Sequence, residues 1–146
     1  MAGHVDRERY KIRLPDENRS FLSDGYFLLE RSDGKRAAHF LELDRGSAGL
    51  ADMHDKFARY FRWWRLEETR RVFQKGFRVL AVTHDESHMQ ALRRVAVPIG
   101  RADGYAKTWK GLLFSHLGAF DLDRPEGILE PVFWYADDDA PVSLLG

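Results

Sequence analysis

The fold of this chain is organised around residues 40–46, which read FLELDRG. Apolar and acidic residues alternate over most of this stretch and a glycine closes it, a pattern that predicts a β-strand ending at a tight turn. Alternate side chains of a strand share a face, so Glu42 and Asp44 are expected together, with Leu41 and Leu43 pointing the other way into a core. The stretch therefore predicts two neighbouring carboxylates at the end of one strand.

The segment that precedes this strand predicts its hairpin partner. Residues 24–31 are rich in Tyr, Phe and Leu, and residues 32–35 contain Asp-Gly, a strong signal for a hairpin turn. Pairing of residues 24–31 with residues 36–44 would bring Asp24 close to the two carboxylates. Three converging carboxylates repel one another unless a cation neutralises them, so the pattern indicates a divalent metal site.

After Gly46 the apolar spacing changes to three and four residues, which predicts a helix that runs as far as Gln74. Its apolar stripe consists of Leu50, Met53, Phe57, Tyr60, Phe61 and Trp64. Residues 77–83 form a nearly continuous apolar run, which is typical of a strand buried on both faces in a parallel pair. Strand, helix and strand then form a crossover unit, and such units are right-handed.

A second helix is predicted to begin with Asp85 as its cap and to end near Pro98. Residues 112–114 predict a fifth strand or a buried turn, and residues 131–135 predict an edge strand because a proline opens the segment. The order strand, strand, strand, helix, strand, helix predicts an α/β fold with one mixed central sheet flanked by helices.

The length of 146 residues suits a single domain, residues 1–146. Residues 1–9 are polar and expected to be frayed, residues 10–14 alternate as a first strand of an antiparallel meander, and residues 119–146 form an acidic extension packed on or near the core. The chain has no cysteine, which excludes disulfides and thiolate sites. No apolar run approaches the roughly 20 residues of a membrane span, and no signal peptide is visible, so a cytoplasmic protein without membrane partners is expected.

Charge is balanced overall but unevenly distributed. Lys and Arg number 23 and so do Asp and Glu, which by itself argues against a general nucleic-acid binder. Residues 56–78 nevertheless carry eight basic and two acidic side chains, and residues 119–146 carry seven acidic side chains against Arg124. Either region can be an ordinary solvated surface. The nucleic-acid alternative assigns DNA-backbone contacts and base stacking to Arg45, Arg59, Arg62, Arg65 and Tyr60.

The strand order, with an Asp opening one strand and acidic residues on the next, resembles the core of the PD-(D/E)xK nucleases. Ser23-Asp24 occupies the place of the Pro-Asp pair and Glu42-Leu43-Asp44 that of the triplet. The chain departs from this restriction-endonuclease-like pattern at Ser23, which matters little, and at Asp44, which stands where the lysine is usual.

The chain also resembles the replication-relaxation family of plasmid and mobile-element proteins, over roughly residues 24–96. The stretches that carry this resemblance are residues 24–27, 40–47 and 77–83, together with Lys56 and Tyr60 on the intervening helix. The resemblance implies a DNA-associated role in plasmid replication or mobilisation, with DNA and replication or mobilisation proteins as partners. Members of that family carry a winged-helix DNA-binding region ahead of this domain, which is not visible here, so a fragment, a truncated homologue and a stand-alone version are all open.

A nuclease must neutralise phosphate charge and activate water, and carboxylate oxygens suit Mg²⁺ or Mn²⁺ for both tasks. Asp24 and Glu42 are the minimal metal ligands, with Asp44 as a third. Lys56 is placed to supply the cation that Asp44 vacates, so the candidate catalytic residues are Asp24, Glu42 and Lys56. These residues predict a Mg²⁺- or Mn²⁺-dependent, nickase-like DNA endonuclease.

An alternative from another class remains open. The missing lysine favours a catalytically inactive nuclease fold that binds DNA or docks to proteins of a replication complex. The two histidines His84 and His88 lie four residues apart but lack the acidic pattern of a zincin, so a zinc site is not favoured. Serine hydrolase signatures, the phosphate loop and the dinucleotide fingerprint are absent.

Overall fold

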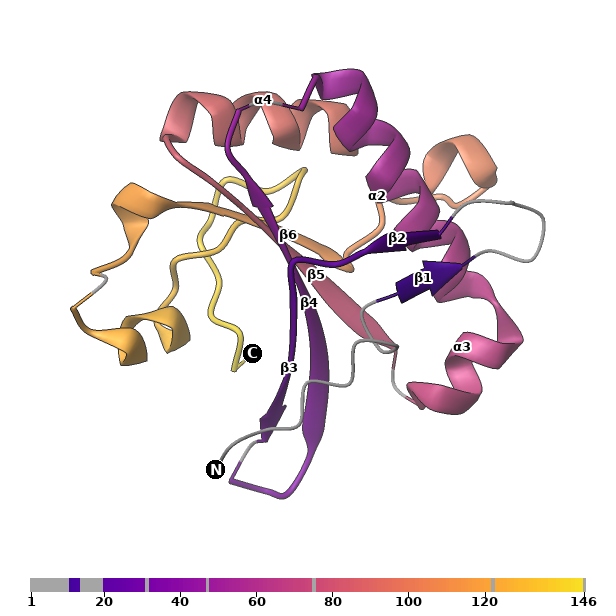
Figure 1. Ribbon diagram of the computed structural model, residues 1–146, viewed down its shortest axis with the longest axis horizontal. Coiled ribbons are helices and arrows are strands. Elements are labelled where there is room, and N and C mark those ends of the chain that lie inside the picture. The colour runs from indigo at the N-terminus through magenta and orange to yellow at the C-terminus, as the bar shows by residue number, and fades with distance from the viewer. Residues whose placement is uncertain are drawn as a thin grey trace.

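A four-stranded mixed sheet forms the centre of the molecule (Figure 1). The computed structural model describes residues 11–13, 20–30, 32–46, 48–74, 76–121 and 123–145. The strands lie in the order β3 (Gly25–Glu30), β4 (Arg36–Asp44), β5 (Phe77–Thr83) and β6 (Leu112–His116). β3 is antiparallel to β4, whereas β5 is parallel to both β4 and β6. The predicted mixed sheet is confirmed, and the segment that began at residue 112 is a strand.

The first strand does not extend the predicted meander. β1 (Lys11–Arg13) pairs with β2 (Ser20–Leu22) in a separate antiparallel sheet, and the main sheet begins at β3. The prediction was wrong because alternation indicates that a strand has one buried face but says nothing about which strand it pairs with. The hairpin of β3 and β4 is confirmed, and the frayed segment expected at residues 1–9 lies outside the described residues.

The single helix predicted up to Gln74 is two helices. α2 (Leu50–Arg65) ends where Leu66 adopts an extended backbone, with φ −68° and ψ 139°, and α3 (Glu67–Val72) begins directly afterwards. No glycine or proline marks this break, so periodicity alone continued the helix through it. Of the helices in the described ranges, none has the length and apolar character that crossing a membrane requires.

The second predicted helix is α4 (Glu86–Ala96). Its cap is Asp85, as expected, whose side chain accepts the backbone N–H of His88 at 2.7 Å. Three short 3₁₀ turns follow, at η1 (Arg101–Asp103), η2 (Leu117–Ala119) and η3 (Pro125–Leu129). The edge strand predicted near residue 131 is reduced to isolated bridges, of which Trp134 pairs with Phe114 beside β6.

Two apolar layers cover opposite faces of the sheet. α2 and α4 pack on one face around Phe40, Phe57 and Phe61, all fully buried (Figure 1). The C-terminal segment covers the other face, where Leu80 and Phe133 belong to a second buried cluster. Because both crossover helices lie on one face, the side chains on that face of β4 from Ala38 to Asp44 are buried beneath them.

Candidate functional site

The helix-facing side of β4 carries both carboxylates of the opening motif. Glu42 is 1% exposed and Asp44 is 5% exposed, and both share their face with Phe40. Leu43 points the opposite way and remains 44% exposed, so its expected place in a core is wrong; Leu41 does pack against the second cluster. The acidic residues were expected on a face of their own, and that face is buried because α2 and α4 cover it.

α2 places two side chains over Glu42. Lys56 and Tyr60 lie one helical turn apart, so they project from the same side of the helix. The ammonium of Lys56 lies 2.5 Å from Oε2 of Glu42, and the hydroxyl of Tyr60 donates a hydrogen bond to Oε1. Both oxygens of this buried carboxylate therefore have partners on one helix.

Asp24 directly precedes β3, beside the end of β4. The regular register of the two strands ends at the pair Gly25–Leu41. The Asp24 N–H donates to the carbonyl of Leu41 at 3.0 Å, and its Oδ2 accepts the N–H of Leu43 at 2.8 Å. The hairpin therefore holds Asp24 against the backbone of β4, near enough for its negative charge to act on Glu42, while Lys56 contacts Glu42 directly.

Burial dominates the electrostatics of this cluster. It raises the pKa of Glu42 to about 7; Lys56 and the hydrogen bond from Tyr60 oppose the rise, and the negative charge of Asp24 adds to it. Burial and then the neighbouring Glu42 raise the pKa of Tyr60 well above its ordinary value, so its hydroxyl stays a hydrogen-bond donor. The site thus holds a carboxylate that ionises near neutral pH, a lysine and a second carboxylate.

Asp44 belongs to a different pair. Its Oδ1 accepts the N–H of Gly46 at 2.9 Å, and its Oδ2 lies against Nε2 of His88 from the first turns of α4. Across the part of the chain that the structure describes, no three His, Asp or Glu side chains form a group suited to a metal ion. Asp24 and Glu42 are brought together, whereas Asp44 is directed to His88.

His88 is the site neighbour that sequence reasoning missed, since it was weighed only with His84 as a zinc pair. The two rings stack with centroids 5.3 Å apart, and Nε2 of His84 lies 3.0 Å from Asp85. A signal existed: parallel strands β4 and β5 end at one edge of the sheet, and α4 starts directly after β5. The first turns of α4 therefore lie beside the end of β4, where Asp44 stands.

The predicted nucleic-acid residues divide into surface and core. Arg45, Arg62 and Arg65 are exposed and Arg59 is half-buried, whereas Tyr60 is fully buried with its ring packed against Phe40. Tyr60 cannot stack on a base, which corrects that expectation. The guanidinium of Arg65 lies 5.6 Å from the ring centre of Phe61, so an aromatic side chain holds it against the helix.

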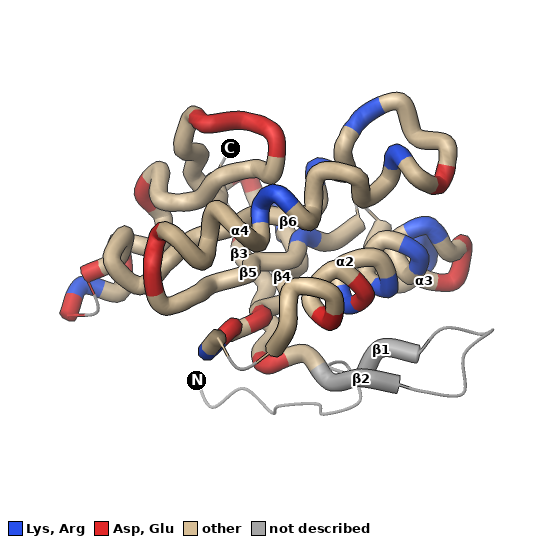
Figure 2. The backbone as a smooth tube through the Cα atoms, turned by 90° about the horizontal axis from the view of Figure 1, so that it is seen from above, with Lys and Arg blue, Asp and Glu red and all other residues tan. Residues whose placement is uncertain are grey.

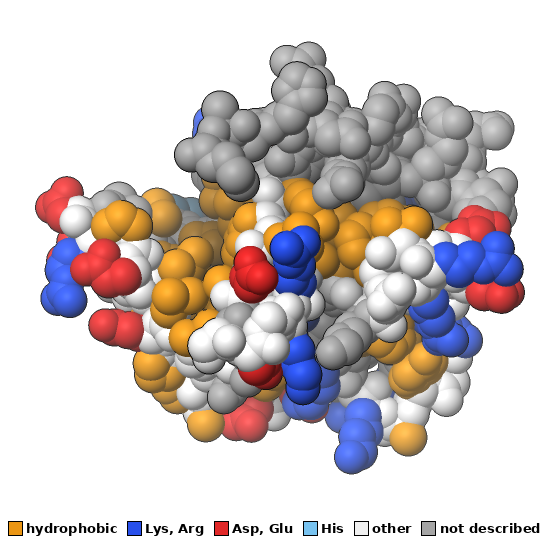
Figure 3. Space-filling model, turned by 90° about the horizontal axis from the view of Figure 1, so that it is seen from below, with side chains coloured by type: hydrophobic (Ala, Val, Ile, Leu, Met, Phe, Trp, Pro, Cys, Tyr) orange, Lys and Arg blue, Asp and Glu red, His pale blue; other side chains and the backbone are white. Residues whose placement is uncertain are grey.

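Basic side chains follow α2 and α3, while the acidic segment 137–139 lies over a different part of the molecule (Figure 2). Asp137 forms an ion pair with Lys110, which lowers the pKa of Asp137, and Asp139 lies 3.2 Å from Arg93 of α4. Seen from below, acidic and basic side chains lie beside one another in several places, with hydrophobic areas between these groups (Figure 3). The acidic segment is therefore tied to α4 and to the start of β6, not to the arginines of α2.

No family model, curated protein or solved structure matches this chain. The family resemblances noted from the sequence thus remain expectations, and the functional case rests on the residues of the site.

Proposed function

We propose that this chain is a divalent-metal-dependent nuclease that acts on DNA, in plasmid or mobile-element replication, with Asp24, Glu42 and Lys56 as its catalytic residues. The observation that carries the proposal is the 2.5 Å contact between Lys56 of α2 and Glu42 of β4. Through this contact the helix provides the positive charge that β4 lacks, because Asp44 stands where a lysine is usual. The antiparallel hairpin, crossover helix and parallel strand also suit a restriction-endonuclease-like core, although β1 lies outside the main sheet.

The residues present fit a hard cation such as Mg²⁺ or Mn²⁺. Asp24 and Glu42 lie near each other and offer oxygen ligands, and Mg²⁺ is commonly held by one or two carboxylates together with phosphate oxygens and water. A cation would also favour the ionised form of Glu42, which burial disfavours. When bound, such an ion neutralises phosphate charge and makes a bound water more acidic.

The protein side chains would divide the remaining tasks. Lys56, with 27% of its side chain exposed, can reach a phosphate at the surface and offset the charge that develops on it. Tyr60 holds Glu42 in one orientation through its buried hydrogen bond. The exposed Arg62 and Arg45 would contact the DNA backbone outside the site.

A second candidate function rests on the same cluster. Both oxygens of Glu42 already bond to Lys56 and Tyr60, so the carboxylate has partners without a metal. A fold of that kind would serve as a non-catalytic module that binds DNA or docks to replication or mobilisation proteins.

Nicking of supercoiled plasmid separates the two candidates. With Mn²⁺ or Mg²⁺, the wild-type protein should convert supercoiled plasmid to the open-circular form, and Glu42→Gln should lower the rate at least 100-fold, because an amide cannot replace a charged ligand. The matched control is Glu67→Gln, which changes an exposed acidic residue on α3 and should leave nicking unchanged. DNA binding without nicking in either metal would favour the non-catalytic module.

A further inference from the structure

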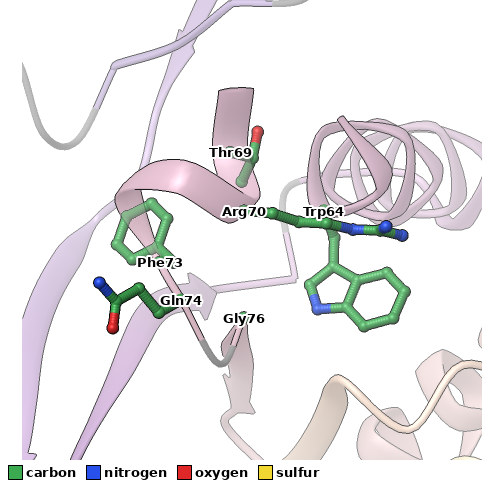
Figure 4. A pocket seen from close by; sticks show the side chains of 6 residues that line it. All are labelled: Trp64, Thr69, Arg70, Phe73, Gln74 and Gly76. Atoms are coloured by element: carbon green, nitrogen blue, oxygen red, sulfur yellow. The ribbon is translucent and has the colours of Figure 1, made fainter. Parts of the chain in front are cut away.

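A hollow of about 300 Å³ opens where α3 follows the end of α2 (Figure 4). It exists because the extended backbone at Leu66 interrupts the helix. The residues that line it are Trp64, Thr69, Arg70, Phe73, Gln74 and Gly76. Its volume lies at the lower end of the roughly 300–1,000 Å³ over which proteins bind small molecules, which suits one planar group.

The two aromatic side chains that line the hollow, Trp64 and Phe73, pack against other aromatic rings of the core. The Trp64 ring lies nearly parallel to Phe61, with centroids 6.2 Å apart, and its centroid is 5.7 Å from that of Trp109. Phe73 meets Phe77 edge-on at 5.6 Å. Walls fixed in this way need little ordering when a ligand enters, so less conformational entropy is lost on binding.

Gly76 lets the Trp64 ring pack directly against the backbone at the edge of the hollow. Its φ is +78°, and a Cβ at this position would lie 2.6 Å from Nε1 of Trp64. Figure 4 shows the Trp64 indole and the Gln74 amide on opposite sides of Gly76. Any side chain at residue 76 would therefore push against the Trp64 ring and change this wall of the hollow.

The polar groups at the hollow are those that recognise nucleotides. An aromatic face stacks on any base, an amide can bond to a base edge, and a guanidinium binds phosphate bidentately. Here Trp64 supplies the face, the exposed Gln74 supplies the amide and the exposed Arg70 supplies the guanidinium. Arg70 extends toward Trp64 in Figure 4, so the charged group and the ring lie on the same side of the opening.

We propose that this hollow binds one nucleotide, free or as an unstacked unit of a single strand, with its base against Trp64 and its phosphate on Arg70. This site goes beyond the proposed nuclease function and does not depend on cleavage at Glu42.

Binding of fluorescein-labelled 12-nucleotide oligothymidylate, followed by fluorescence anisotropy in EDTA, tests the site. Arg70→Ala should weaken binding about tenfold, because it removes a charge-assisted phosphate contact. The matched control is Arg71→Ala on the next position of α3, whose guanidinium pairs with Glu67 at 3.1 Å and does not line the hollow. Its loss should weaken binding no more than about twofold through general charge.

Tryptophan fluorescence gives a second measurement. Stacking of thymine on Trp64 should quench the emission of the wild-type protein, and Trp64→Phe, which keeps an aromatic wall, should lose most of this quenching. Thermal unfolding of each variant checks that the fold is retained. Competition by thymidine monophosphate would identify a site for free nucleotides, and its failure would identify a site for a strand.

Equal losses for Arg70→Ala and Arg71→Ala, quenching that persists in Trp64→Phe, or no oligothymidylate binding in EDTA would each overturn the proposal. Binding is measured in EDTA, where a divalent-metal-dependent nuclease cannot cleave. A failed nicking assay would then leave the nucleotide site standing, and a failed binding assay would leave the nicking result standing.

Discussion

Glu42 combines deep burial with a charge that the fold only partly compensates. Its carboxylate is 1% exposed and bonds to Lys56 and Tyr60, yet its pKa still rises to about 7 because desolvation outweighs both partners. An acidic group whose pKa is higher in the folded than in the unfolded protein binds more protons when folded. Its ionisation therefore lowers stability as the pH rises from its unfolded value toward about 7.

Glu42→Gln should reveal this cost as a pH-dependent difference in stability. At pH 5 the native Glu42 is mostly protonated, so the variant and the wild type should differ little. Above pH 7 the folded wild type carries the free-energy cost of ionising Glu42. The free energy of unfolding of the variant should then exceed that of the wild type by on the order of 3 kcal/mol, which is the equivalent of the pKa rise. Urea unfolding at pH 5 and pH 8 in EDTA measures both values, and a difference that does not change with pH would contradict the assignment.

Gly76 lets the chain turn from α3 into β5 beneath Trp64. Its φ of +78° lies in the left-handed region, and the indole occupies the place of any side chain. The break at Leu66 and this turn together create the hollow between α2 and α3.

Gly76→Ala should destabilise the protein by roughly 2–4 kcal/mol, because backbone strain adds to a clash with the braced Trp64 ring. Gly34→Ala is the matched control, since its φ is +82° but no atom lies within 4 Å of the added Cβ. That variant should lose only the strain, about 1 kcal/mol. Chemical unfolding compares the two, and equal losses would show that the Trp64 contact contributes nothing.

The parallel strands β4, β5 and β6 explain why the two acidic positions of β4 have different neighbours. α2 crosses above Glu42 and α4 starts beside Asp44, so each helix supplies a partner to the carboxylate beneath it. The exposed arginines of α2 lie on its outer surface, whereas Lys56 and Tyr60 lie toward the sheet.

Arg93 holds the acidic C-terminal segment against α4, which links two distant parts of the molecule. It is 4% exposed, and it donates to the carbonyls of Tyr135 at 2.9 Å and Asp138 at 2.5 Å and to the Gln90 side chain at 2.7 Å. The acidic segment is therefore held by contacts to its backbone as well as by its ion pairs with Arg93 and Lys110.

Arg93→Met should release this segment, because the carbonyls it bonds would lose their donor. We expect a loss of about 2–4 kcal/mol in unfolding free energy and faster hydrogen exchange of the amides of residues 136–142. Arg94→Met changes the exposed neighbour on the same helix and should do neither. Unchanged exchange in Arg93→Met would mean that the apolar contacts of Phe133 and Leu144 hold the segment alone.

Local patterns in the sequence were enough to determine the elements. The Asp-Gly turn at residues 33–34, the alternation of residues 40–44 and the apolar run of residues 77–83 predicted the hairpin and the buried parallel strand, because each depends on neighbours along the chain. They also placed Asp24 near Glu42 and Lys56 above it.

Only the tertiary structure determined which strands pair and which side chains contact one another. It separated β1 from the main sheet, ended α2 at Leu66 and buried Tyr60. It also directed Asp44 to His88, which lies 44 residues further along the chain. These outcomes depend on which surfaces compete for the same space, and no local pattern records that competition. The sequence of residues 40–46 thus predicts two neighbouring carboxylates by itself. The helices above the strand determine that one carboxylate contacts a lysine and the other a histidine.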